Sequence, residues 1–154
     1  MKRIFIVAVI ITFIDQIIKN ALFFNFSLNE SLTVIDNFFN ITLLGNTGAA
    51  FSILLANTSL LIAVSVIAII LIYWFFIKNQ VLDKKSQYIY GILFGGIIGN
   101  LIDRLFRGYV IDYLDFTIFG YSFPVFNLAD ICITISIVLL IFYIYKGEKN
   151  ENRS

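Results

Sequence analysis

Four long apolar stretches divide the chain, and each is long enough to cross a bilayer as a helix. A transmembrane helix needs about 20 mostly apolar residues to cross a hydrocarbon core of roughly 30 Å. The stretches cover approximately residues 4–23, 57–77, 87–105 and 126–145. The sequence therefore predicts an all-α membrane protein with four transmembrane helices, which form a single domain over residues 1–154.

Basic residues lie mainly on one side of the predicted helices. Eight of them precede the first helix, connect the second to the third, or follow the fourth: Lys2, Arg3, Lys78, Lys84, Lys85, Lys146, Lys149 and Arg153. Only Lys19, Arg104 and Arg107 lie near the opposite ends. Because cytoplasmic loops carry an excess of Lys and Arg, we expect both termini in the cytoplasm. The connections of about residues 24–56 and 106–125 then face outward.

The first outward connection has the pattern of a β-hairpin. Residues 32–35 and 38–44 are rich in β-branched and aromatic side chains, and Asp36-Asn37 between them is a typical turn pair. A small extracytoplasmic β-sheet is therefore expected to rest on the outer membrane surface. We expect the second connection to be a short loop that carries Asp112 and Asp115, with Asp115 in contact with solvent.

The composition supports a membrane protein and narrows its chemistry. Hydrophobic residues make up 60% and charged residues 14% of the chain, against roughly 45–50% and about 25% in soluble domains. No histidine is present, which excludes Ser-His-Asp and Cys-His nucleophilic systems and His-ligated zinc. A single cysteine, Cys132, cannot form an internal disulfide, and a net charge of +1 gives no argument for nucleic acid. Any catalysis must use carboxylates, hydroxyls, amides or the backbone.

Asp130 is the clearest polar residue within a predicted span. A charged side chain in a bilayer costs at least ~2.5–3.5 kcal/mol, so each one suggests a function. The fifteen residues from Ile131 to Tyr145 provide about 22 Å of helix at ~1.5 Å per residue, too little to cross the membrane. The helix must therefore extend back through Asp130, about one turn below the outer surface, with Asn127 on the same face.

Other polar residues gather at a similar depth on the first and third helices. Asn100, Asp103 and Arg104 lie near the outer end of the third helix, and Asp15 and Lys19 are four residues apart on the first. We expect Asp103 and Arg104 to form an interfacial ion pair or to contact phosphate. Asp15 and Lys19 are expected to form an internal pair or a hydrogen-bond anchor.

Small residues on the third helix form a seam at four-residue spacing. Gly91, Gly95 and Gly99 would lie on one helix face. Such a seam lets another helix approach closely, so we interpret these glycines as packing residues.

The clustered carboxylates are compatible with more than one function. Two neighbouring carboxylates cannot both ionise easily, so they can share one proton and act as the acid and the base of peptide hydrolysis. A proton-coupled transporter could use Asp130 as a relay, and position alone leaves Asp112 and Asp130 open between catalysis and structure. The polar residues stop near the outer leaflet, which favours a site over a conduit. A non-catalytic scaffold would leave the costly Asp130 without a purpose.

Five short motifs follow one another along the chain. They are Asp15-Gln16 with Lys19, Asn46-Thr47-Gly48-Ala49-Ala50-Phe51, the block from Gly95 to Arg104, Val110-Ile111-Asp112-Tyr113, and Phe126-Asn127-Leu128-Ala129-Asp130. In this order the motifs resemble those of the lipoprotein signal peptidases, the type II signal peptidases of bacteria. Each string is weak alone, but five in sequence on four predicted spans are specific.

The resemblance implies an intramembrane aspartic endopeptidase with Asp112 and Asp130 as its catalytic pair. Its substrate would be a prolipoprotein whose cysteine already carries diacylglycerol, and cleavage just before that cysteine would form no covalent enzyme intermediate. The resemblance also implies that Asn46, Gly48, Asn100, Arg104 and Asn127 bind the substrate or support the catalytic pair. Asp15 lies at a further functional position of the family, where its role is more structural than chemical.

The resemblance further implies a bacterial cytoplasmic (inner) membrane location, with the active site on the extracytoplasmic side. The expected partners are lipid-modified prolipoproteins and membrane phospholipid, with no nucleic acid, no metal and no cofactor. We expect the chain to act as a monomer.

Overall fold

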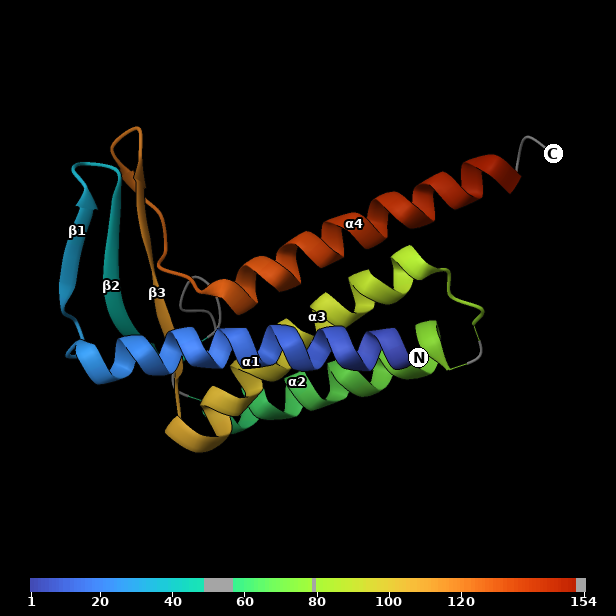
Figure 1. The fold of residues 1–154 in the computed structure, drawn as a ribbon, viewed down its shortest axis with the longest axis horizontal. Helices are drawn as coiled ribbons and strands as arrows, with labels where there is room; N and C mark the ends of the chain where they lie inside the picture. The colour runs from blue at the N-terminus through green and yellow to red at the C-terminus, as the bar shows by residue number, and fades with distance from the viewer. Residues whose placement is uncertain (49–56, 79, 152–154) are drawn as a thin grey trace.

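Four helices and a small antiparallel sheet make up the described part of the chain (Figure 1). The structure, a computed structural model, describes residues 1–48, 57–78 and 80–151, without the side chains of residues 144 and 146–151. The helices are α1 (Lys2–Asn25), α2 (Thr58–Ile72) with its π-helical continuation η2 (Tyr73–Ile77), α3 (Lys84–Arg107) and α4 (Leu128–Glu151). The strands are β1 (Ser31–Ile35), β2 (Phe39–Asn46), β3 (Val110–Ile118) and β4 (Tyr121–Ser122).

Three of the four predicted spans are long and apolar enough to cross a membrane. These are α1, α2 together with η2, and α3. In α4 the apolar stretch within the continuously described side chains, Leu128–Tyr143, falls below that length. The fourth span and the orientation of the termini therefore stay predictions.

Helix α3 packs closely on α1 through its glycines. A Cβ atom at Gly91 would lie 2.7 Å from Val7 Cβ, and one at Gly95 would lie 2.6 Å from Ile11 Cβ. Both distances are too short for a side chain, so only glycine allows this approach. The predicted packing role of the seam is confirmed for α1, and Gly96 makes a similar approach to α4.

The predicted hairpin is confirmed as β1 and β2, which pair in antiparallel register. The turn between them contains Asn37 in a left-handed conformation with φ 58°, which asparagine adopts more readily than most residues. A register irregularity between Thr33 and Ile35 interrupts the ladder close to this turn.

The sequence predicts strands only within residues 32–44, but the second outward connection also contains one, because Val110–Ile118 form strand β3 against β2. Asp115 is half-buried and accepts a hydrogen bond from Thr42 Oγ1 at 2.7 Å, so its expected solvent contact is also corrected. The physical reason is that Val110–Ile118 is rich in β-branched and aromatic side chains, which favour a strand packed beside a neighbour.

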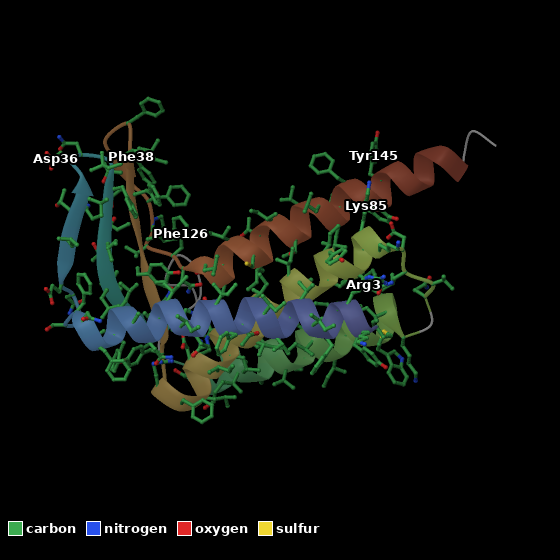
Figure 2. All side chains as sticks on the ribbon, in the orientation of Figure 1. Arg3, Asp36, Phe38, Lys85, Phe126 and Tyr145 are labelled. Atoms are coloured by element: carbon green, nitrogen blue, oxygen red, sulfur yellow. The ribbon has the colours of Figure 1, made fainter. Side chains whose placement is uncertain are left out.

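The sheet is attached to the outer half of α1 by a small apolar core. Leu43, Ile111 and Tyr113 are buried there and pack against side chains that include Ile18 and Leu22 of α1. Figures 1 and 2 show the sheet across one end of the helices, with Arg3 and Lys85 near the opposite end. This attachment holds β3 above the helix ends, where the polar residues gather.

Candidate active site

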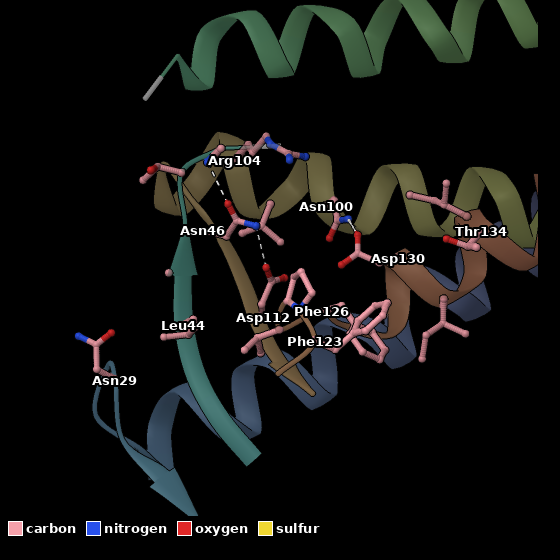
Figure 3. A pocket seen from close by; sticks show the side chains of 18 of the residues that line it. Asn29, Leu44, Asn46, Asn100, Arg104, Asp112, Phe123, Phe126, Asp130 and Thr134 are labelled. Carbon is pink, nitrogen blue, oxygen red and sulfur yellow. Dashed lines mark hydrogen bonds between the residues drawn. The ribbon is translucent and has the colours of Figure 1, made fainter. Parts of the chain in front are cut away.

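A cavity of about 950 Å³ lies between the sheet and the outer ends of α3 and α4 (Figure 3). Six of the eight residues that the sequence assigned to the site line it: Asn46, Gly48, Asn100, Arg104, Asp112 and Asp130. Asn127 does not line the cavity but contacts the lining residue Asp112, and Asp15 lies farther behind, in contact with Lys19 and Ala129. The cavity therefore brings together residues from β2, β3, α3 and α4.

Asp112 reaches the cavity from β3 and is almost fully buried, at 3% exposure. Its Oδ2 accepts a hydrogen bond from Asn46 Nδ2 at 2.8 Å, and its Oδ1 accepts one from Asn127 Nδ2 at 2.6 Å. Asn46 is itself oriented by Gly48, whose N–H donates to Asn46 Oδ1 at 2.9 Å. Burial and, secondarily, the charge of Asp130 raise the pKa of Asp112 to about 6.

Asp130 lies in the first turn of α4 and takes part in a reciprocal cap. Its Oδ2 accepts the Asn127 N–H at 3.1 Å, and its own N–H donates to Asn127 Oδ1 at 3.0 Å. Asn127 therefore precedes α4 instead of sharing a helix face with Asp130, which corrects the predicted helix start at residue 126. Such a reciprocal arrangement satisfies two backbone donors that a helix start leaves free, and the helix dipole favours a negative charge there.

Asparagine amides connect the two carboxyl groups. Asn100 Nδ2 donates to Asp130 Oδ1 at 2.8 Å, while Asn127 Nδ2 donates to Asp112 and also to Asn100 Oδ1, at 3.2 Å. Lys19 Nζ donates to the same Asn100 oxygen at 2.8 Å. With two donors on its oxygen, Asn100 must turn its amide nitrogen toward Asp130.

A buried charge cluster lies behind the cavity. Lys19 contacts Asp15 and Asp103, each at 2.9 Å, and all three side chains have no solvent exposure. Asp103 also pairs with Arg107, so the expected ion pair between Asp103 and Arg104 is wrong. The physical reason is that residue 107 lies one helical turn from Asp103, whereas residue 104 points about 100° away around the helix.

The predicted internal pair of Asp15 and Lys19 is confirmed. Asp15 has a further contact, because its Oδ1 accepts the Ala129 N–H of α4 at 3.2 Å. It thus connects α1 to the start of the helix that carries Asp130.

Among the described residues that line the cavity, Arg104 is the one with a cationic side chain. Its Nε atom is buried and has no hydrogen-bond partner within the described part of the chain. A buried guanidinium donor without a partner is costly, and Arg binds carbonyl, carboxylate and phosphate oxygens well. Arg104 is therefore suited to bind a ligand oxygen in the cavity.

Sequence reasoning missed the contribution of Tyr113. Its hydroxyl oxygen accepts the Leu128 N–H of α4 at 3.2 Å. The residue lies in a recognised motif beside Asp112, but its partner fifteen positions away cannot be found from spacing. Ala49, Ala50 and Phe51 of the second motif lie outside the described residues.

The described residues, 1–48, 57–78 and 80–151, contain no group of side chains arranged as a metal site. No cluster of three His, Cys, Asp or Glu side chains is placed there to hold a metal ion. The chemistry that the arrangement can perform is proton transfer, since two carboxyl groups line one cavity with amide donors around them.

Comparison with known proteins identifies the family. The profile of signal peptidase (SPase) II matches residues 7–146. Proteins named lipoprotein signal peptidase from Staphylococcus aureus strains JH9 and Newman are each 36% identical over 146 residues, covering 95% of this chain and 90% of theirs.

Two solved structures share the fold. A bacterial membrane enzyme solved by the in meso method at 2.3 Å has a TM-score of 0.88 and 35% identity, covering 97% of this chain and 92% of its own. A second bacterial membrane enzyme, solved at 1.9 Å, has a TM-score of 0.82 and 35% identity, with 94% and 93% covered. The chain therefore belongs to the signal peptidase II family, a family of peptidases.

Proposed function

We propose that this chain is an aspartic endopeptidase that removes the signal peptide from diacylglyceryl-modified prolipoproteins, cleaving just before the lipidated cysteine. The observation that carries the proposal is that Asp112 and Asp130 line one cavity and are joined through Asn127 and Asn100. The names of its relatives support the substrate class.

In this proposal the two carboxyl groups share one proton. The raised pKa of Asp112 favours Asp112 as the group that keeps it. The other carboxyl group of the pair, Asp130, takes a proton from a water molecule as the water oxygen attacks the scissile carbonyl carbon. Asp112 gives its proton to the departing nitrogen, and the C–N bond breaks. Water supplies the hydroxyl and the carboxyl pair returns to one proton, so no covalent enzyme intermediate forms.

The surrounding residues bind the substrate or support the pair. Asn46 and Asn127 stabilise the charged form of Asp112 by donating to it, and Gly48 orients Asn46. Asn100 supports Asp130 in the same way, by donating a hydrogen bond to its Oδ1. Arg104 is free to bind a peptide carbonyl or a lipid headgroup oxygen.

The wall of the cavity along α4 suits a lipid-modified substrate. Ile131, Ile133 and Ile135 line it beside Asp130, and Phe123 lines it from the segment before α4. This apolar wall would take the acyl chains and the signal helix while the scissile bond lies next to the carboxyl groups. Asp15 acts behind the wall by anchoring the start of α4.

The proposed location is a bacterial cytoplasmic membrane, crossed several times, with the cavity on the extracytoplasmic side. Lys and Arg residues near the end of the helices opposite the sheet support this orientation (Figure 2). Membrane phospholipid and the prolipoprotein are the proposed partners of a chain that acts as a monomer.

The test compares purified wild type with Asp112→Asn and Asp130→Asn on a diacylglyceryl-modified prolipoprotein and on its unmodified form. We expect the wild type to cleave the lipidated form alone and each variant to lose cleavage, because an amide can neither hold nor transfer the proton. Gel shift measures cleavage, and mass spectrometry of the product locates the cleaved bond.

Asp115→Asn is the matched control, since Asp115 lies on the same strand and bonds to Thr42 away from the cavity. It should retain cleavage. Activity in Asp112→Asn or Asp130→Asn would contradict the catalytic pair. A folded wild type that cleaves neither substrate would contradict the proposed function, and proton flux in liposomes would then test the transporter alternative.

A further inference from the structure

The start of α4 is held by side chains from other elements. The first N–H groups of a helix have no partner within the helix. In α4, the Leu128 N–H donates to the Tyr113 hydroxyl of β3, and the Ala129 N–H donates to Asp15 of α1. The backbone position of Asp130 is thus fixed from outside its own helix.

Tyr113 reaches this helix start from the face of β3 opposite to the cavity. Successive residues of a strand point to opposite faces, so Asp112 lines the cavity while Tyr113 is buried against Leu43 and Ile111. Tyr113 is 5% exposed. Burial raises the pKa of Tyr113 to about 12, which keeps the hydroxyl neutral. The titratable groups that face it are Asp15 from α1 and Asp130 and Cys132 from α4.

Strand β3 and the start of α4 meet at a joint close to both carboxyl groups. Leu114 N–H donates to the Phe126 carbonyl at 2.8 Å, and Phe126 N–H donates back to Leu114 at 3.1 Å. These two bonds fix the chain just before α4. The Tyr113 bond fixes the next point, at Leu128, two residues before Asp130.

We infer that Tyr113 is a positioning residue, whose hydroxyl fixes the first turn of α4 against β3 and thereby sets the separation of Asp112 and Asp130. The inference rests on the proposed function, because it concerns the geometry of that carboxyl pair. The strength with which two carboxyl groups share a proton depends on their separation. A small shift of α4 would therefore change both the rate and its pH dependence.

The test is Tyr113→Phe, which keeps the buried ring and removes only the hydroxyl. Tyr109→Phe is the matched control, since no hydrogen bond of the Tyr109 hydroxyl is found within the described residues, and its ring packs against Gly45. We expect Tyr113→Phe to lower kcat about five- to tenfold, because a first turn of α4 that is no longer fixed lets the carboxyl pair leave its productive geometry. KM should stay within about twofold, and the two limbs of the kcat–pH profile should move closer together.

A purely structural role would lower the yield or Tm of Tyr113→Phe and leave kcat per folded enzyme and the pH limbs unchanged. That result, with an active wild type, overturns the inference while the proposed function stands. If the wild type does not cleave, the proposed function fails, and the catalytic part of the inference fails with it. Hydrogen exchange over residues 126–131 then tests the remaining part, that the Tyr113 hydroxyl fixes the first turn of α4. Faster exchange in Tyr113→Phe than in Tyr109→Phe supports it, and equal exchange overturns it.

Discussion

The carboxyl pair is surrounded by amides and kept apart from the nearest lysine. Asn46 and Asn127 donate to Asp112, and Asn100 donates to Asp130. Lys19 contacts neither carboxyl group of the pair and reaches the site through the oxygen of Asn100. An amide stabilises a carboxylate without adding a charge. Direct contact with a cation would favour two ionised carboxylates and remove the shared proton. The amide contacts therefore suit the proposed pair, in which two carboxyl groups share one proton.

Asn46→Ala tests this role at the residue scale. The Asn46 amide stabilises the charged form of Asp112 and so lowers its pKa. Its loss should raise the pKa of Asp112, so the alkaline limb of kcat/KM against pH should move to higher pH, by about half a unit to one unit. Asn40→Ala on the same strand is the control, because no side-chain hydrogen bond of Asn40 is present in the described ranges. A shift to lower pH would contradict the role of Asn46.

At the scale of elements, α3 is the helix on which the site is assembled. Its glycines let α1 and α4 approach, and its outer end carries Asn100 and Asp103 to the two neighbours. The distance between helix axes thus decides whether Lys19 reaches Asn100. Helix α3 therefore determines both how closely α1 and α4 pack and where the polar side chains of the site lie.

Gly95→Ala should therefore destabilise the protein. The added Cβ would lie 2.6 Å from Ile11 Cβ and 3.0 Å from the Ala8 carbonyl oxygen, so α1 must move. Overpacking of this kind costs roughly 1–3 kcal/mol, and thermal unfolding in detergent should show a lower Tm. Leu105→Ala, at a side chain of the same helix that is 56% exposed, should leave Tm nearly unchanged. An equal Tm for Gly95→Ala would show that α1 and α3 are not in such close contact.

Hydrophobic pattern was sufficient for the helices and for the β1–β2 hairpin, because each is a local periodicity. The hydrophobic pattern did not predict β3, because aspartates such as Asp112 and Asp115 are typical of loops. Strand β3 depends instead on its pairing with β2. The hydrophobic pattern also cannot predict contacts between segments that lie far apart in the sequence. The pair of Asn46 and Asp112 joins residues 66 positions apart, and the Tyr113 bond depends on how β3 meets α4.

The candidate residues could be selected from motifs, but their partners could not. Asp103 was paired with its neighbour Arg104 from sequence, whereas the fold brings Lys19 from another helix and leaves Arg104 in the cavity. Spacing along one helix gives the i, i+4 contacts only. The position of a charge relative to other helices depends on packing.

At the scale of the whole molecule, the two ends differ in chemistry. Asp36 and Phe38 lie at the sheet end, and Arg3 and Lys85 lie at the other (Figure 2). If the orientation follows the positive charges, the sheet faces outward.

Cysteine labelling tests that orientation, because Cys132 is the single cysteine of the chain. Asp36→Cys and Lys85→Cys, each in a Cys132→Ser background, place one thiol at either end. We expect a membrane-impermeant maleimide to label Asp36→Cys in intact spheroplasts and Lys85→Cys only after permeabilisation. The reverse pattern would contradict the predicted topology.

The buried charge cluster also bears on how the helices enter the bilayer. Asp15 and Lys19 form an i, i+4 pair within α1, and Asp103 and Arg107 form another within α3. Each of these two pairs is electrically neutral within its own helix, which reduces the ~2.5–3.5 kcal/mol cost that each of the four charges would carry alone in the bilayer. Lys19 bridges the two pairs only once α1 and α3 meet. Membrane insertion can thus proceed one helix at a time, before the cavity between the sheet, α3 and α4 exists.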